Sequence, residues 1–261
     1  MKPLLWLAIF GCREPLTVSV DHVMDDPSYA WGSLLGLVVS EDGYVNYELL
    51  KENRGTLDHY VAWVSQDDLF AKERATSHHH AFWLNTYNAL VMFQILERDQ
   101  PESVLDIGEW TPVDGAGFFL FTSFDVARNQ LSLAEIRDEQ IRWREMDYRS
   151  HAAMNSGMRS SPPLSRELYT GPTLFTQLRT QMSRWVNDPD RGVYVEGDLV
   201  MINPLFETYA RDFDFFSGGL DLCTIAARHA AKPLADELRR LSKEGCPTQT
   251  YAFDSSLNEY P

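Results

Sequence analysis

The segment that most constrains the fold is "HHHAFWLNTYNALVMFQILER", residues 78–98, because it is apolar on nearly every side when it is wound as a helix. A helix at the surface of a domain shows one apolar stripe, so a helix without a polar face has to be buried. We predict a central helix over residues 80–96, with Trp83 inside the core. The rest of the chain must supply the elements that cover it.

Apolar residues three and four positions apart predict the helices that cover the central one. This pattern occurs in residues 29–39, 57–69, 132–146, 164–190, 218–230 and 232–244. Ser132 and Glu135 have the spacing of a capping box, and Pro172 suits a first helical turn. A hairpin is expected to turn at residues 196–198, and "QTYAF" predicts a last strand. The predicted fold class is α+β: a mostly helical single domain with a small antiparallel or mixed sheet.

The balance of charge excludes some partners. The 261 residues include 38 acidic and 23 basic side chains, which gives a formal charge of −15. Such a chain repels phosphate backbones, so we expect no nucleic-acid partner and no direct docking onto anionic lipid. No run of 18 apolar residues occurs, and no membrane-spanning helix is expected. A small molecule or a peptide stays open as the ligand, and the composition identifies no protein partner.

The first twelve residues, "MKPLLWLAIFGC", have the order of a bacterial lipoprotein signal segment. Lys2 gives a basic start, an apolar run follows, and Gly11-Cys12 resembles the cleavage site at which the cysteine becomes the lipidated N-terminus. In similar lipoproteins an Asp after the cysteine tends to retain the chain at the inner membrane, whereas this chain has Arg13. The sequence therefore predicts an outer-membrane lipoprotein on the periplasmic face of the cell envelope. A buried first strand or a wrongly chosen start codon is the alternative.

The expected organisation is a signal segment over residues 1–12, a polar tether over 13–27 and one domain over 28–261. If Cys12 carries lipid, Cys223 and Cys246 remain. In an oxidising periplasm these two either pair or stay as two buried thiols, and their spacing permits both.

Several motifs follow one another in an order that resembles a known family. They are "GYVNY", "AFWLNTYNAL", "LSLAEIRDEQIR", "HAAMNSGMRSSPPL", "FETYARDF" and "FDSSLN". The set is similar to the bacterial and plant family called domain of unknown function 547, and the resemblance runs from about Trp31 to Asn258. It implies a shared fold and names no reaction.

This chain departs from the family pattern at two places. Family members usually carry cysteine where this chain has Ser156 and Ser161, and Glu-His where it has Arg137-Asp138. If a family cysteine is a nucleophile paired with that histidine, this member has lost the chemistry, because a serine without its base is a poor nucleophile. If the two cysteines instead form a disulfide, their joint replacement by serine is expected and the site survives.

The stretch "HAAMN" at residues 151–155 opens the candidate site. If it is a strand, alternation puts His151 and Asn155 on one face, and Ser156 and Ser161 follow in the loop. The two serine side chains are then expected to point toward each other or toward a shared cavity. We expect the loop over residues 151–164 to border the main cavity of the protein.

Asn85 and Asn88 lie three positions apart on the central helix and face the same way. Buried amides need partners, so one interpretation is that they cross-link the 151–164 loop to the helix. The other is that they line a pocket with His151. Asp212, between Tyr209 and Phe213, is either a site acid or a residue that ties down a loop.

Two functions follow from these residues. One is a lipid-anchored binding protein with degenerate chemistry, whose ligand meets Asn85, Asn88, Asn155 and Asp212. The other is a hydrolase or acyl transferase that uses Ser156 or Ser161 with His151. In a purely structural interpretation, His151 donates a hydrogen bond to a backbone carbonyl, and the serine hydroxyls accept hydrogen bonds from backbone amides of the turn.

A metal site is not expected. Adjacent histidines on a helix point about 100° apart, and His78-His79-His80 has no partner four residues on, as a helical zinc pair requires. The motifs predict no metal and no cofactor.

Overall fold

The computed structural model describes residues 13–66, 76–108 and 113–260, so residues 1–12, where the signal segment and the lipidated Cys12 are predicted, lie outside the described residues. The fold is α+β, as predicted, and it contains two hydrophobic clusters. The first core joins buried apolar residues between Trp31 and Leu178, together with Leu257. The second core joins Ala152 with buried residues between Met182 and Leu241. Within the described ranges, no helix combines the length and apolar character needed to cross a membrane.

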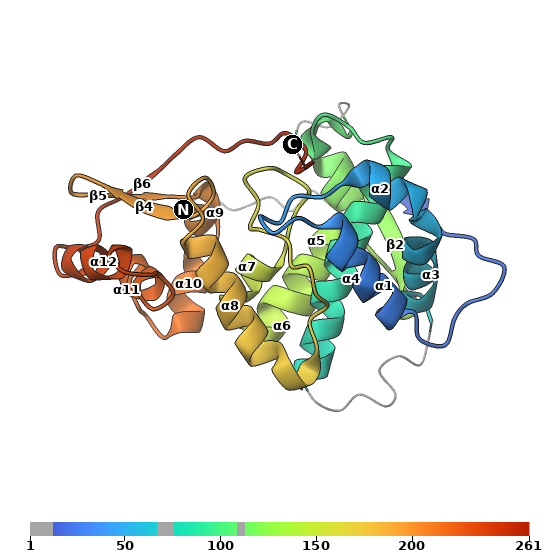
Figure 1. Cartoon of the computed structure of the whole chain (residues 1–261), viewed down its shortest axis with the longest axis horizontal. Helices are drawn as coiled ribbons and strands as arrows, with labels where there is room; N and C mark the ends of the chain where they lie inside the picture. The colour runs from blue at the N-terminus through green and yellow to red at the C-terminus, as the bar shows by residue number, and fades with distance from the viewer. Residues whose placement is uncertain (1–12, 67–75, 109–112, 261) are drawn as a thin grey trace, which may run out of the picture.

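Figure 1 shows the two cores side by side, with the blue-to-green elements around one and the orange-to-red elements around the other. The elements of the first part are β1 (Glu14–Leu16), α1 (Ser28–Val38), α2 (Tyr47–Glu52), α3 (Arg54–Val64), α4 (Thr76–Glu97), η1 (Val104–Asp106), η2 (Gly117–Phe121), β2 (Thr122–Val126), β3 (Asn129–Leu131), α5 (Leu133–Glu135), η3 (Ile136–Arg142), α6 (Trp143–Glu145) and α7 (Ser150–Ala153). The elements of the second part are η4 (Gly171–Thr173), α8 (Leu174–Val186), β4 (Val193–Glu196), β5 (Leu199–Ile202), α9 (Pro204–Thr208), α10 (Ala210–Ser217), α11 (Leu222–Ala227), α12 (Leu234–Ser242) and β6 (Thr248–Thr250).

Helix α4 is the centre of the first core, as its sequence predicts. Trp83 is 3% exposed and Phe93 is fully buried, and buried side chains occur on every side of the helix. The buried amide of Gln94 donates to the Thr122 hydroxyl of β2 at 3.0 Å, so even the polar side chains of the helix are used in packing. Helix α3 and the short elements η3, η4 and α5 pack against α4, and α1 packs on α3.

The second core is built on stacked aromatic rings. Trp185 of α8 lies parallel to Phe206 of α9 with 4.2 Å between the ring centroids, and Phe213 of α10 packs on both. Cys223 and Cys246 form a disulfide, which resolves the alternative left open by their spacing. The bridge joins the start of α11 to the segment before β6.

The strands form two small mixed sheets rather than one. In the first sheet β1 runs parallel and β3 antiparallel to β2; in the second, β4 runs antiparallel and β6 parallel to β5. The predicted hairpin is confirmed, because β4 and β5 turn between Glu196 and Leu199. After β6 the chain crosses back to the first core, where Glu259 forms a bridge with Val45 and Leu257 with Met158 (Figure 1).

Two local expectations need correction. The sequence "EDGYVNYELL", residues 41–50, predicts a turn and a short extended piece, but residues 47–52 form the helix α2. The Asn46 side chain caps this helix by accepting a hydrogen bond from the Leu49 amide. The helix predicted over 132–146 is confirmed with its Ser132–Glu135 capping box, but residues 136–142 are wound as a π-helix.

Candidate functional site

His151 lies on a short helix, so the expected strand over "HAAMN" is wrong. The Asp147 carboxylate accepts a hydrogen bond from the Arg149 amide, and the Ser150 amide donates to the Asp147 carbonyl. These two bonds start the turn that becomes α7. An alternation of small and larger residues over five positions was too short to outweigh this local turn chemistry. His151 therefore points away from the serine loop and toward α10.

The partner of His151 is the carboxylate of Asp212. The Nε2 atom of His151 lies 2.8 Å from Oδ2 of Asp212, and the Arg142 guanidinium donates to both Asp212 oxygens at 2.7 and 3.1 Å. His151 is 5% exposed and Asp212 1% exposed. An ionised carboxylate accepts only, so the Nε2 atom of a neutral His151 carries the proton.

The π-helix η3 brings two arginines to this carboxylate. Arg137 bonds its neighbour Asp138 at 2.8 Å, and Arg142, four residues after Asp138, bonds the same carboxylate at 2.6 Å. Arg142 then extends the chain of ion pairs to Asp212. The resulting ion-pair cluster consists of Arg137, Asp138, Arg142, His151 and Asp212.

Tyr209 covers the ion-pair cluster. Its ring stacks on the His151 imidazole with 4.3 Å between centroids, and the Arg142 guanidinium lies 4.5 Å from the same ring centroid. On its other side the imidazole meets Phe213, 5.3 Å away. Each charge has an opposite partner, and aromatic rings exclude water from the imidazole. The family's Glu-His pair would fall at Arg137-Asp138, inside this cluster.

Burial sets the charge states within the cluster. Desolvation lowers the pKa of the His151 imidazole and outweighs the attraction of Asp212, so the ring is neutral near pH 7. Burial opposes ionisation of Asp212, but hydrogen bonds from His151 and Arg142 are stronger and hold its pKa at about 2. The arrangement is a histidine oriented by an ionised carboxylate, which is two-thirds of a nucleophilic triad.

The third member of such a triad is not supplied by the predicted serines. Ser156 and Ser161 point at each other, with 2.7 Å between their hydroxyl oxygens, which confirms the expected approach of these side chains. Ser161 is fully buried, and its hydroxyl also accepts from the Ser156 amide at 3.4 Å. These two side chains bond within the serine loop, while the His151 ring bonds Asp212.

The asparagines cross-link the serine loop to the core. Asn88 donates to the Ala153 carbonyl at 2.8 Å and accepts from the Asn155 amide at 2.9 Å. Asn155 in turn accepts from Asn258 of the C-terminal segment. Asn85 holds the backbone of Tyr169 through two bonds instead. Asn88 therefore cross-links the 151–164 loop to the helix as the structural interpretation expects, whereas Asn85 binds the backbone after that loop.

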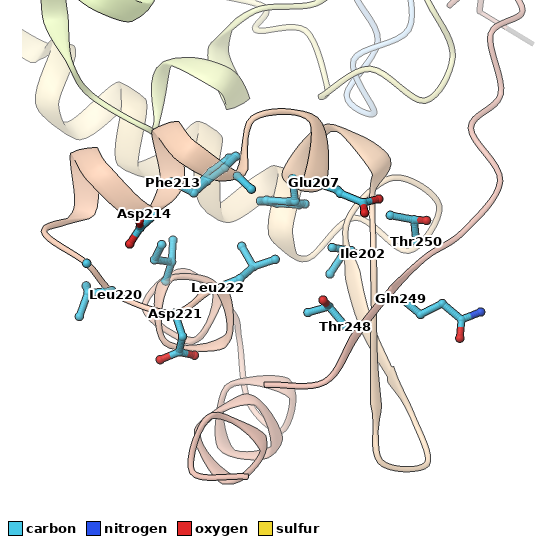
Figure 2. Close-up of a pocket in the computed structure, with 14 residues that line it drawn as sticks. Ile202, Glu207, Phe213, Asp214, Leu220, Asp221, Leu222, Thr248, Gln249 and Thr250 are labelled. Atoms are coloured by element: carbon cyan, nitrogen blue, oxygen red, sulfur yellow. The ribbon is translucent and has the colours of Figure 1, made fainter. Parts of the chain in front are cut away.

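A cavity of considerable size lies away from the 151–164 loop among the described residues, and this loop does not line it, contrary to the expectation that it borders the main cavity. This cavity has a volume of about 680 Å³ and is lined by Ile202, Phe206, Glu207, Ala210, Phe213, Asp214, Gly219, Leu220, Asp221, Leu222, Ile225, Thr248, Gln249 and Thr250. We call it the acidic cavity. Figure 2 shows side chains of the helical segments on one side of it and those of β6 on the other. The space near Asn88 and Leu164 is only about 10 Å³.

Sequence reasoning singled out Asp212 of the cluster but missed Arg142 and the acidic cavity. The signal for Arg142 was its place four residues after Asp138, the spacing of an ion pair on one helix face. The cavity residues come from five elements, β5, α9, α10, α11 and β6, and the loop before α11, whose packing no local pattern reveals. Phe213 connects the two sites, because its ring packs on His151 and also lines the cavity.

The triple histidine serves structure among the described residues. His79 lies 3.1 Å from Glu145 and accepts from the Trp83 indole, while His80 pairs with the Ser150 hydroxyl. These bonds join α4 to α6 and α7.

The fold and the site define an α+β domain with a buried histidine–aspartate–arginine cluster. Residues 72–186 match the family model described as "Protein of unknown function, DUF547", so the recognised family is confirmed over this region. No curated protein and no solved structure matches the chain. The matched region contains His151, Arg142 and both serines, whereas Asp212 and the whole lining of the acidic cavity lie after it.

Proposed function

We propose that the protein is a lipid-anchored cell-envelope protein that binds an extended peptide with basic and apolar side chains in the acidic cavity. The observation that carries this proposal is the lining of the cavity, which combines three carboxylates with an apolar floor. Glu207, Asp214 and Asp221 are exposed, and among the described residues none of them makes an ion pair. A pocket with uncompensated charge of one sign attracts a ligand of the other sign.

The edge of β6 supports a peptide rather than a compact small molecule. Val200 donates to the Pro247 carbonyl and the Tyr251 amide donates to the Ile202 carbonyl, so the residues that flank Thr248 and Thr250 on their outer sides are bonded to β5, with which β6 pairs in parallel. By alternation the amide and carbonyl groups of Thr248 and Thr250 point to the open edge. Both residues line the cavity. A peptide strand added there gains backbone hydrogen bonds, and its alternate side chains enter the cavity.

The apolar side chains on the floor of the acidic cavity would bind the apolar side chains of the peptide. Phe206, Phe213 and Ile225 are buried, while Leu220 and Leu222 are half-buried toward the opening. Apolar side chains of a bound strand would cover this surface, at about 25 cal/mol for each Å² removed from water. Basic side chains beside them would reach Glu207 and Asp214 at the rim, while Asp221, which accepts hydrogen bonds from Thr224 and Ser242, adds its negative charge.

A pair of synthetic peptides tests this proposal. We expect an alternating Lys-Val octapeptide to bind the full chain in fluorescence anisotropy, and a Glu-Val octapeptide to bind at least about tenfold more weakly. Thr250→Pro removes an outward amide and should abolish binding, whereas Thr250→Val keeps the amide and should retain it. Equal binding of both peptides, or no effect of Thr250→Pro, contradicts the proposal.

The membrane anchor is tested separately. The order of Lys2, the apolar run and Gly11-Cys12 supports lipidation of Cys12. We expect Cys12→Ser to move the protein from the membrane fraction to the soluble fraction, and mass spectrometry of the wild type to show a lipidated Cys12. A soluble wild-type protein with residues 1–11 intact contradicts the anchor but leaves peptide binding unaffected.

The hydrolase and acyl transferase alternative has less support. It requires His151 to activate Ser156 or Ser161, but the imidazole is bonded to Asp212 and the hydroxyls are bonded to each other. A fluorophosphonate probe distinguishes the two functions, because it labels serines activated by a base. We expect no labelled peptide to contain Ser156 or Ser161. Labelling that His151→Ala removes would favour the enzyme.

A further inference from the structure

A second cavity, of about 450 Å³, lies where α6, α7, α8, α10 and the end of α11 meet. It is lined by Glu145, Met146, Asp147, Tyr148, Arg149, Phe175, Arg179, Phe216, Arg228 and His229. We call it the arginine pocket. Three guanidinium groups in one pocket are notable in a chain whose formal charge is −15, because a random patch of this surface would be acidic.

The charge of the arginine pocket is only partly compensated. Arg149 is neutralised by Asp147, whose carboxylate lies 2.6 Å from the guanidinium. Glu145 is bonded to His79. Arg179 and Arg228 are exposed, and over the described ranges neither forms an ion pair. Two unpaired guanidinium groups therefore face the same space.

His229 lines the arginine pocket, so the charges around the pocket act on its imidazole. Its carbonyl accepts from Ser183 at 2.7 Å and from Asn187 at 3.0 Å, which fixes the residue against α8. Its Nε2 atom lies 3.2 Å from the Tyr148 hydroxyl, and its Nδ1 atom is buried without a hydrogen-bond partner. The ring is 9% exposed.

Desolvation lowers the pKa of the His229 imidazole to about 4, and the three arginines act in the same direction. Asp147 opposes them. The imidazole is therefore neutral near pH 7, and the positive charge of the pocket comes from guanidinium groups alone. An anion that offsets these arginines would make protonation of His229 easier.

Aromatic rings form the wall beside the arginines. Phe175 lies four residues before Arg179 on α8, so both side chains share one face of that helix. Phe175 is 67% exposed, and the Arg149 guanidinium lies over its ring, 4.5 Å from the ring centroid. Phe216 of α10 is half-buried on another side. This wall fits an apolar or aromatic body rather than a bare ion.

We propose that the arginine pocket binds a phosphate monoester with an aromatic or apolar body, its oxyanion between Arg179 and Arg228. The guanidinium fork matches the geometry of phosphate oxygens, and hydrogen bonds between two charged groups are the strong ones. The aromatic body would lie against Phe175 and Phe216. This inference does not depend on the peptide function of the acidic cavity.

Calorimetric titration with phenyl phosphate tests the site. We expect the full chain to bind phenyl phosphate at least about tenfold more tightly than inorganic phosphate or phenol. Inorganic phosphate lacks the aromatic body, and phenol lacks the oxyanion. Arg179→Gln with Arg228→Gln should weaken binding about 100-fold or more. The matched control, Arg211→Gln with Lys243→Gln, removes two exposed cations outside the pocket and should change binding less than about threefold.

The pKa of His229, followed by NMR, gives a readout that a purely structural arginine cluster would not move. Saturating phenyl phosphate should raise it from about 4 toward the ordinary value. In the double glutamine variant the pKa should already be higher and should no longer respond to the ligand. No heat of binding in the wild type, equal loss in the control variant, or an unchanged His229 pKa each overturns the proposal.

Discussion

The first core is organised around one helix, α4, whose buried side chains point in every direction, whereas the second core has no central helix. Instead, short helices and a small sheet surround the stacked rings of Trp185 and Phe206. Polar groups also differ between the two. In the first core Asn88 bonds across the structure through both ends of its side-chain amide. The second core leaves charges uncompensated at both of its cavities.

This difference teaches where ligands are expected to bind. A polar group whose hydrogen bonds are all made inside the protein has none left for a ligand. An unpaired charge beside a cavity can still attract and bind a ligand of the opposite charge. The matched family region covers most of the first core and ends with α8. Both proposed ligand sites draw residues from beyond that region, so they are properties of the second core.

The largest effect is expected from Trp83→Ala in the first core. Deleting a buried large aromatic side chain costs about 3–5 kcal/mol in the free energy of unfolding, since the space it leaves stays empty. Urea unfolding followed by circular dichroism measures the loss. Leu37→Ala on α1, at a position 72% exposed, is the control and should cost less than about 1 kcal/mol. Similar costs for both variants would show that Trp83 is not part of the core.

The ion-pair cluster joins the two cores, and Asp212→Asn should break it. We expect a loss of about 3–4 kcal/mol, because Arg142 and His151 keep their burial but lose a charged partner. The exposed Asp214→Asn is the control and should have little effect.

The pH dependence of stability checks the same cluster. Asp212 has its pKa lowered to about 2, so its contribution is present above the ordinary value and is lost as pH falls through about 2. The amide variant should show a correspondingly smaller loss of stability below pH 4. Identical acid profiles for wild type and variant would mean that Asp212 does not contribute as a carboxylate.

The disulfide should matter for the second core. Cys223 and Cys246 close a loop of 23 residues, and the loss of such a bridge destabilises by about 3 kcal/mol. We expect Cys223→Ser with Cys246→Ser to lower the urea midpoint by the corresponding amount, and reductant to affect the wild type alone. If reductant leaves the wild type unchanged, the bridge contributes nothing to stability.

The smallest effect concerns the serines of the first core. Ser156→Cys with Ser161→Cys should form a bridge under oxidation, seen as a mass loss of about 2 Da, because the two hydroxyl oxygens already lie 2.7 Å apart. The stability gain should be about 2 kcal/mol, since the closed loop is short. The single variant Ser156→Cys should show no intramolecular mass loss. A double variant that stays reduced would favour the nucleophile account of the family cysteines.

The first core was the part that the sequence predicted well. The continuous apolar surface of residues 80–96 allows only burial, and a capping box at Ser132 is a local signal that survives any packing. The site was predicted less well. Asn88 and the serine pair lie as expected, but His151 belongs to a helix and faces Asp212 across 61 positions of the sequence. Contacts at such separation depend on how the second core packs, which periodicity does not encode.

Helix α8 belongs to both cores. Leu174 and Leu178 near its start pack in the first, while Met182, Trp185 and Val186 near its end pack in the second. Neither core can lose its packing without freeing one end of the same helix. The chain should therefore unfold in one cooperative transition despite having two cores, and the backbone amides in the middle of α8 should be among the slowest to exchange with deuterium.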